Sequence, residues 1–274
     1  MDALISVLAE IKGRLYESFY AKPCHVDPER PLFSVSFDDV PISAVTRGVP
    51  ILEKFGIKAT FYAALNIERR GPHEASSAEK SKRNFTSVDE LRDLHRAGHH
   101  IGCHTYSHYR LASGTAAGLA WDALKNRLEL SKALDGVRID HFAYPFGEVS
   151  FRAKHLLEPG YLSMRTVRPG INSGRVDLNY LRAVGILARD FDRDRIQRWI
   201  DLNGRRRGWL IFYTHGVDPN PEPWDCLPDQ LAWVIDACQR SGGEIRTVAE
   251  ACAMYVENGR KAPPSPPGPD VFHH

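Results

Sequence analysis

The chain has no charge-free apolar stretch of membrane-spanning length, no closely spaced cysteine pair and no excess of charge of one sign. Its 36 lysines and arginines nearly balance 34 aspartates and glutamates, leaving a formal net charge of +2. This balance supplies no basic surface for tracking nucleic acid, so we expect no nucleic-acid partner. With 274 residues, the chain is long enough to bury a sizeable core as one domain.

The cysteines give no indication of cross-links. The five cysteines are odd in number and include no Cys-x-x-Cys pair. Neither a disulfide framework nor a thiolate zinc site is therefore indicated. We expect reduced thiols, which are typical of a cytoplasmic protein.

The first twenty residues favour an amphipathic helix whose apolar face is interrupted by charged residues. Its apolar positions are Leu4, Leu8, Ile11, Leu15 and Phe19. The pattern is typical neither of a signal peptide nor of a transmembrane segment. Docking on a partner or peripheral contact with a membrane surface are alternatives. Packing against the folded domain is favoured, because the polar face is not rich in lysine or arginine.

Predicted strands and helices alternate along the chain. The strand candidates are 32–37, 59–64, 142–144, 181–184, 210–213 and 244–248. The helix candidates are 42–55, 87–97, 116–134, 193–202 and 228–240. Ser87 and Glu90 have capping-box spacing, and Gly56 follows a predicted helix end. Repeated strand–helix units favour a parallel sheet, open or closed, and the polar segment 69–84 is predicted to be a surface loop near the site.

A pair of carboxylates follows the first predicted strand. Asp38 and Asp39 are adjacent, and neighbouring residues at a strand end point in different directions. One could therefore bind a metal while the other faces a substrate. The alternative is a purely structural pair that forms an Asx turn or caps the following helix.

Two histidines, His104 and His108, lie four residues apart after another predicted strand. On a helical turn this spacing brings both imidazoles to one side, at a separation suited to one divalent ion. Two imidazoles and a carboxylate leave coordination positions open, as catalytic metal sites do. The alternative is two unrelated histidines on a surface helix.

Two further segments end apolar runs. Residues 142–147 combine aromatic residues with proline and glycine, giving a rigid apolar wall and a backbone N–H that could stabilise an oxyanion, or merely a tight turn. His215 follows the apolar run 209–213. It is a candidate general acid near neutral pH, unless it is a core histidine with a structural hydrogen bond.

In this order, the motifs resemble those of the NodB-type polysaccharide deacetylases, carbohydrate esterase family four. The resemblance runs from about residue 32 to 251, and its most specific segments are 36–39, 98–108 and 144–147. It implies an α/β fold, a distorted (β/α)7 barrel over 31–258. A helical extension at 1–30 would pack on the barrel, and a flexible proline-rich tail would occupy 259–274.

The resemblance also implies the roles of individual residues. One divalent ion, most often zinc, with cobalt, nickel or manganese as alternatives, would be held by Asp39, His104 and His108. Asp38 would deprotonate metal-bound water, and His215 would protonate the leaving amine. The substrate and oxyanion site would consist of Tyr144, Pro145 and Phe146, with the backbone N–H of Phe146 and the metal stabilising the oxyanion.

The sequence departs from the family pattern at three positions. Val40 stands where a glycine often follows the aspartate pair, and Cys103 stands where asparagine often precedes the first metal histidine. Ala143 occupies the position of an arginine that orients the base. Arg182, near the end of a later predicted strand, is the candidate substitute for that arginine.

The expected function is metal-dependent removal of N-acetyl groups from an amino sugar. Because no secretion signal is predicted, the expected substrate is an intracellular nucleotide- or lipid-linked precursor of a surface polysaccharide, and the expected location is the cytoplasm. One alternative is hydrolysis of a small non-sugar amide or imide by the same chemistry. Another is a non-catalytic carbohydrate-binding homologue, although the retained Asp38 and His215 argue against it.

Overall fold

The computed structural model of the chain describes residues 19–67 and 84–256. The predicted N-terminal helix, nearly all of the predicted loop at 69–84 and the proline-rich tail lie outside these residues. Within them, no helix is long and apolar enough to cross a membrane. All five cysteines are free, as expected.

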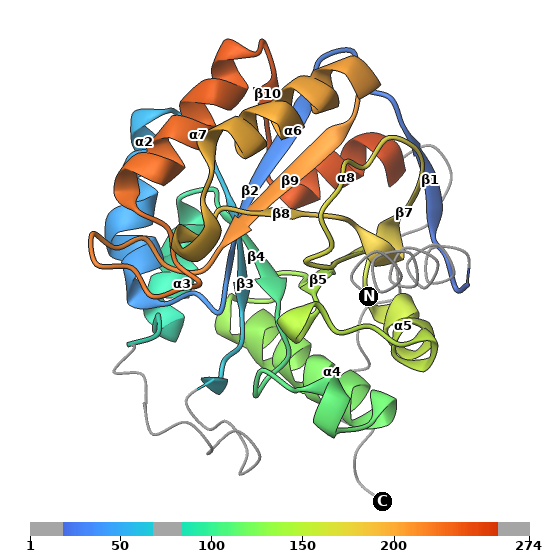
Figure 1. Cartoon of the computed structure of the whole chain (residues 1–274). Helices are drawn as coiled ribbons and strands as arrows, with labels where there is room; N and C mark the ends of the chain where they lie inside the picture. The colour runs from blue at the N-terminus through green and yellow to red at the C-terminus, as the bar shows by residue number, and fades with distance from the viewer. Residues whose placement is uncertain (1–18, 68–83, 257–274) are drawn as a thin grey trace, which may run out of the picture.

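The centre of the fold is a parallel sheet that curls into a barrel (Figure 1). In spatial order its strands are β6 (Ser163–Arg165), β5 (His141–Ala143), β4 (His100–Cys103), β3 (Thr60–Ala63), β2 (Leu32–Asp38), β9 (Trp209–Thr214) and β8 (Val184–Gly185). The short β10 (Glu244–Ile245) pairs with the start of β2. The edges meet where Leu181, just before β8, bridges to Arg165. The predicted distorted (β/α)7 barrel is confirmed.

Helices cover the outside of this sheet. They are α2 (Val49–Lys54), α3 (Val88–Arg96), α4 (Ala116–Ala133), α5 (Phe151–Leu157), α6 (Arg193–Arg206), α7 (Pro228–Arg240) and α8 (Val248–Val256). In Figure 1, α6 and α7 lie over β2 and β9, and α4 lies beside β4 and β5. The helix predicted at 42–55 is divided, because a π-helical turn at Ala44–Gly48 precedes α2.

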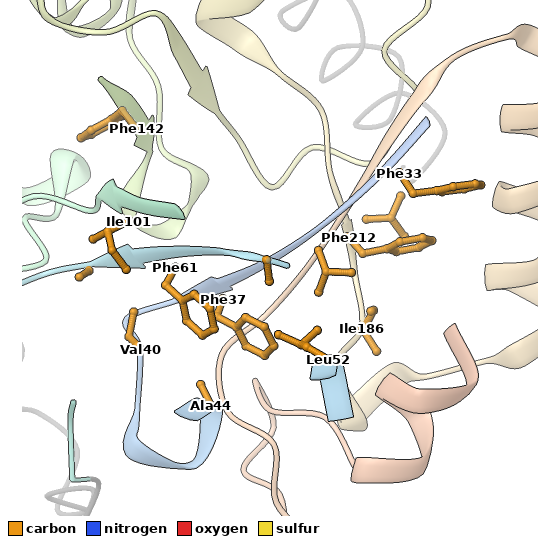
Figure 2. Close-up of a cluster of buried hydrophobic side chains, with 14 of the residues drawn as sticks. Phe33, Phe37, Val40, Ala44, Leu52, Phe61, Ile101, Phe142, Ile186 and Phe212 are labelled. Carbon is orange, nitrogen blue, oxygen red and sulfur yellow. The ribbon is translucent and has the colours of Figure 1, made fainter. Parts of the chain in front are cut away.

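The central strand β2 shows why the barrel forms around these residues. Side chains alternate between the two faces of a strand, and the odd-numbered Phe33, Val35 and Phe37 lie in the main hydrophobic core. Figure 2 shows Phe37 against Phe61, with ring centroids 4.8 Å apart. The even-numbered side chains face the barrel interior, where the indole of Trp209 donates to Ser34 Oγ at 2.9 Å. This alternation directs Asp38, the last residue of β2, inward as well.

The amino-terminal end of the barrel is closed by α8 and by an antiparallel ribbon of β1 (Pro23–Val26) and β7 (Gly174–Asp177). The backbone N–H of Val248 donates to Thr60 Oγ1, 2.9 Å away at the start of β3. A second core cluster joins Val26 and Val176 of the ribbon to Ala251 of α8. The strand predicted at 244–248 therefore stops early, because its last residue begins α8. The closed base leaves the opposite end of the barrel to carry the site.

Candidate active site

The sequence-predicted site residues follow the carboxyl ends of the strands. Asp38 ends β2, His104 follows β4, and His215 follows β9. Phe37 of β2 pairs with Thr214 of β9. Asp38 and His215 each follow one member of this pair, so they lie side by side at the ends of neighbouring strands. Since all these strands are parallel, their carboxyl ends share one rim of the barrel. This is where parallel α/β proteins place their ligand sites.

Asp39, His104 and His108 form a compact buried group. His108 Nε2 lies 3.2 Å and His104 Nε2 lies 3.6 Å from Asp39 Oδ1. One ligand atom from each residue lies within 4.8 Å of the others. The expectation that a helical turn brings the histidines together is wrong. His104 extends from the end of β4, and an irregular loop returns the chain to His108.

The chemistry of this group fits a divalent cation. His104 Nδ1 lies 2.8 Å from the carbonyl oxygen of Ala143, which fixes that nitrogen as the donor. Burial lowers the pKa of His104, so its ring is neutral and Nε2 directs a lone pair toward the Asp39 carboxylate. A lone pair and a carboxylate repel each other unless a cation lies between them. The outer carbonyl on a histidine is also a regular feature of metal sites.

A side chain not singled out from the sequence holds the loop between the two histidines. The Asp122 carboxylate, on α4, accepts hydrogen bonds from the backbone N–H groups of Tyr106 at 2.7 Å and Ser107 at 2.9 Å. It also accepts from Ser107 Oγ at 3.0 Å. Its signal in the sequence is weak, because Asp122 is one acidic residue in a long amphipathic helix. The site is thus supported by α4 as well as by the strands.

Backbone strain is concentrated at the same rim. Five non-glycine residues there have positive φ: Asp39, Val40, Thr105, His108 and Phe146, with values from 53° to 62°. Such conformations cost on the order of 1–3 kcal/mol each and persist where the surrounding structure imposes them, often at functional sites. Two of these strained residues belong to the proposed metal set.

A buried arginine orients Asp38, and it is Arg165 rather than the expected Arg182. Arg165 Nη2 donates to Asp38 Oδ1, and both side chains are almost fully buried. Arg165 is the β6 partner of Ala143 in the β5–β6 register. The arginine missing from position 143 is therefore supplied at the same level by the adjacent strand. The backbone of Arg182 instead exchanges hydrogen bonds with Asn172.

Two tyrosines hold the Arg165 guanidinium in the barrel interior. Its Cζ atom lies 5.0 Å from the ring centroid of Tyr62 and 5.2 Å from that of Tyr213. Burial acts to lower the pKa of Arg165, but the attraction and hydrogen bond of the Asp38 carboxylate, together with Tyr62 and Tyr213, outweigh this effect and the pKa is raised. The arginine is therefore a permanent positive charge beside Asp38.

Residues 144–146, which follow β5, place some side chains in the core and one at the rim of the barrel. Tyr144 is buried, with its hydroxyl 3.4 Å from Met164 Sδ, so this side chain belongs to the core and not to the predicted substrate wall. Pro145 is buried too. Phe146 is 40% exposed, and its ring centroid lies 4.4 Å from that of His108. Only Phe146 of the three presents its side chain at the rim.

His215 is oriented by the loop that follows it. Its Nδ1 lies 3.0 Å from the carbonyl oxygen of Trp224, and its backbone N–H donates to the same oxygen at 3.3 Å. With Nδ1 as the donor, Nε2 is the nitrogen available for proton transfer.

A second group, His100, Asp140 and His141, also has closely spaced potential ligand atoms. His100 and His141 begin β4 and β5, so this group lies at the opposite end of the barrel. Asp140 is paired with Arg138 at 3.2 Å. The group is therefore separate from the rim that carries the strained residues.

A parallel α/β barrel with a buried aspartate–histidine–histidine group at its strand ends belongs to the class of α/β proteins whose rim residues could hold a metal ion. The comparisons are more specific. The family model described as "Polysaccharide deacetylase" matches residues 25–160 of this chain. The recognition made from the motifs is thereby confirmed. The match includes the Asp–His–His set and Asp38, and it ends before Arg165 and His215.

Known relatives agree with this assignment. A chitin deacetylase from Pestalotiopsis sp is 37% identical over 87 residues, which are 32% of this chain and 25% of that protein. The match thus spans a quarter of the relative's length. A family 4 acetyl xylan esterase from Clostridium thermocellum, in complex with a cobalt ion, has a TM-score of 0.54 at 21% identity, covering 81% of this chain and 91% of that one.

The Bc1960 peptidoglycan N-acetylglucosamine deacetylase has a TM-score of 0.57 at 18% identity, covering 83% of this chain and 91% of that one. At such identities the structural likeness establishes the fold alone. A pseudoenzyme from Bacillus Anthracis shares this fold at 12% identity and a TM-score of 0.53. Turnover must therefore be argued from the residues at the rim.

Proposed function

We propose that the protein is a metal-dependent hydrolase that removes N-acetyl groups from an amino sugar. The observation that carries this proposal is the buried pair of Asp38 and Arg165 beside the Asp39–His104–His108 group. A protein that only binds sugar has little use for a buried carboxylate held by a dedicated arginine next to a metal-type site. Burying such a pair is costly, and a catalytic role accounts for its presence.

The residues divide the chemistry of amide hydrolysis between them. A divalent ion held by Asp39, His104 and His108, zinc in our proposal, would supply Lewis acidity and lower the pKa of water when bound. Asp38, with one oxygen held by Arg165, takes the proton of the attacking water on its other oxygen. His215 gives a proton from Nε2 to the leaving nitrogen while Nδ1 stays on the Trp224 carbonyl.

The oxyanion formed during attack needs a hydrogen-bond donor. The backbone N–H of Phe146 serves this purpose in our proposal, because the Phe146 ring is in contact with His108 and so lies next to the metal group. The strained φ of 59° at Phe146 fixes the direction of this peptide group. Preorganised donors of this kind reduce the barrier by about 3 kcal/mol.

We further propose that the substrate is a nucleotide- or lipid-linked precursor of a surface polysaccharide and that the protein works in the cytoplasm. The support is that all five cysteines are free and four of them are buried, which suits a reducing compartment.

The test is acetate release by the zinc-loaded protein from N-acetylated nucleotide sugars, lipid-linked sugars and chitooligosaccharides. Asp38→Asn is expected to keep its zinc and lose most turnover, whereas His104→Ala is expected to lose both zinc and turnover. Unchanged turnover in Asp38→Asn would contradict its role as base. No acetate from any substrate, with zinc bound, would favour a small-amide hydrolase or a non-catalytic binding protein.

A further inference from the structure

An exposed tryptophan beside His215 carries an arginine on its ring. Trp224 is 47% exposed, although tryptophan usually buries most of its surface. The guanidinium carbon of Arg189 lies 3.7 Å from the centroid of the Trp224 ring. The same tryptophan presents its ring 6.4 Å from that of His215. The pair therefore stands at the rim, next to the proposed acid.

The two segments that carry the pair are fastened together. The backbone N–H of Ala188, next to Arg189, donates to the carbonyl oxygen of Asp225 at 2.7 Å. The Asp225 carboxylate is buried and accepts from the N–H of Gly216 at 2.6 Å. The loop that presents Trp224 is thus tied both to the end of β9 and to the Arg189 segment. The pair is held in place before any ligand binds.

The positive charge of Arg189 is not neutralised by a neighbour. In the described part of the chain, no carboxylate forms an ion pair with Arg189, and the adjacent Asp190 faces Arg195 at 3.7 Å. Through the Trp224 ring, Arg189 lies on the side of the rim that carries His215.

Stacking determines what this arginine can do. A guanidinium that lies flat on an aromatic ring keeps its N–H donors at the edge of the plane, where they can bind a carboxylate or phosphate with two hydrogen bonds. On the other side of the metal group, Arg110 lies 4.6 Å from the Phe146 ring, but Glu148 pairs with it at 3.4 Å. Of these two arginines, only Arg189 has no ion-pair partner among the described residues.

We propose that Arg189, held on Trp224, binds an anionic group of the substrate next to the acetylated sugar. The inference rests on the proposed function, since it places that group beside the acid His215. It assigns the substrate to the anionic glycans. The anion is either the phosphate of a nucleotide- or lipid-linked sugar or the carboxylate of a neighbouring uronate.

Calorimetric titration of the zinc-loaded full chain tests the proposal. The probes are UDP-N-acetylglucosamine, a hyaluronan tetrasaccharide and neutral chitotetraose, and released acetate is measured in the same samples. We expect at least one anionic probe to bind more tightly than chitotetraose, and Arg189→Gln to weaken that binding about tenfold. Arg189→Lys is expected to restore little, because an ammonium group cannot form the planar fork.

The matched control is Arg193→Gln, since Arg193 lies 5.4 Å from the ring of Trp233 and pairs with Asp229 at 3.6 Å. Equal weakening in the two glutamine variants, or no preference for an anionic probe, would overturn the proposal. If only UDP-N-acetylglucosamine binds, the substrate is a nucleotide- or lipid-linked precursor. If only the hyaluronan tetrasaccharide binds, the substrate is a uronate-containing polymer. Arg189-dependent binding without acetate release would refute the proposed function only. If chitotetraose releases acetate, Arg189→Gln leaves this release unchanged and the anionic probes bind no more tightly than chitotetraose, then the anion site is refuted and the proposed function is not.

Discussion

Arg165 holds Asp38 by a hydrogen bond between two strands that lie far apart in the chain. It is separated from Asp38 by 127 residues, and it lies in a three-residue strand. An arginine in so short an apolar stretch indicates a surface turn, whereas here the barrel closes around it. Asp38, Asp39, His104 and His108 could be located because their motifs lie next to strongly apolar strands. The catalytic roles of Asp38 and His215 stay predictions.

At the residue scale, we predict that Arg165 positions the base. Arg165→Lys keeps the charge but loses the planar fork and the contacts with Tyr62 and Tyr213. We expect kcat to fall by about tenfold to a hundredfold, the range typical of residues that orient a reacting group, with little change in KM. Zinc content and melting temperature should stay close to those of the wild type. A loss of kcat that follows the unfolded fraction would show a structural role only.

A second prediction concerns the strained residue after the aspartate pair. Val40 is buried, β-branched and held at φ 54°, a conformation that favours glycine. Val40→Gly and Val40→Ala both lose the packing of the valine methyl groups, so comparing these two variants isolates the effect of backbone conformation. We expect Val40→Gly to unfold at a higher urea concentration than Val40→Ala. The difference in free energy of unfolding should be about 1 kcal/mol.

The control for this prediction is the same pair of substitutions at Val35, in the middle of β2. There the order should reverse, because glycine in a strand is less stable than alanine by about 0.5–1 kcal/mol. The same order of stability at both positions would show that the backbone at Val40 is not strained.

At the element scale, the elements with strong local signals were predicted well. The capping box expected from Ser87 and Glu90 is present at the start of α3, and α7 has the predicted bounds. The ribbon of β1 and β7 was missed, because it pairs residues about 150 positions apart and has no local turn signal. The loop that joins His104 to His108 was not predicted, and the helical turn considered for this spacing is absent, since the shape of the loop depends on Asp122 from α4.

The capping box gives a prediction for one element. Ser87 Oγ accepts from the Glu90 N–H at 3.3 Å, and Glu90 Oε2 accepts from the Ser87 N–H at 2.7 Å. Ser87→Ala removes the first bond and should lower the free energy of unfolding by about 1 kcal/mol. Ser87→Asp, which keeps a capping oxygen, should lose little. Urea unfolding measures both variants, and equal losses would mean that the cap contributes nothing.

At the scale of the whole molecule, the barrel could be predicted as a class but its closure could not. Repeated strand–helix units favour any parallel sheet, whereas closure depends on the pairing of Arg165 with Leu181 and on further hydrogen bonds between the two edges, such as that from the Ala183 N–H to the Arg168 carbonyl oxygen. The base of the barrel was not predicted either. The strand predicted over 244–248 runs directly into α8, and no turn residue between them marks the start of this helix. Tertiary contacts at this end bury several histidines.

These histidines predict how global stability depends on pH. Burial lowers the pKa of His99 to about 4 and those of His100 and His141 to about 3. In the unfolded chain the same groups titrate near pH 6.5. Between these values the unfolded state binds more protons, so stability is complete above about pH 6.5 and falls as the pH is lowered toward 4. The three groups together set a slope of at most roughly 4 kcal/mol per pH unit.

Urea unfolding of the metal-free protein at pH 7, 6 and 5 measures this slope without the contribution of a bound ion. His99→Asn isolates one group, because its side-chain oxygen can replace His99 Nδ1, which accepts from the Ala59 N–H at 3.2 Å. This variant should lose less stability between pH 6 and 5 than the wild type, by about 1 kcal/mol. An identical slope in both proteins would mean that His99 becomes protonated in the folded barrel. His99 would then be open to water in the folded state, contrary to its burial against the Phe61 ring.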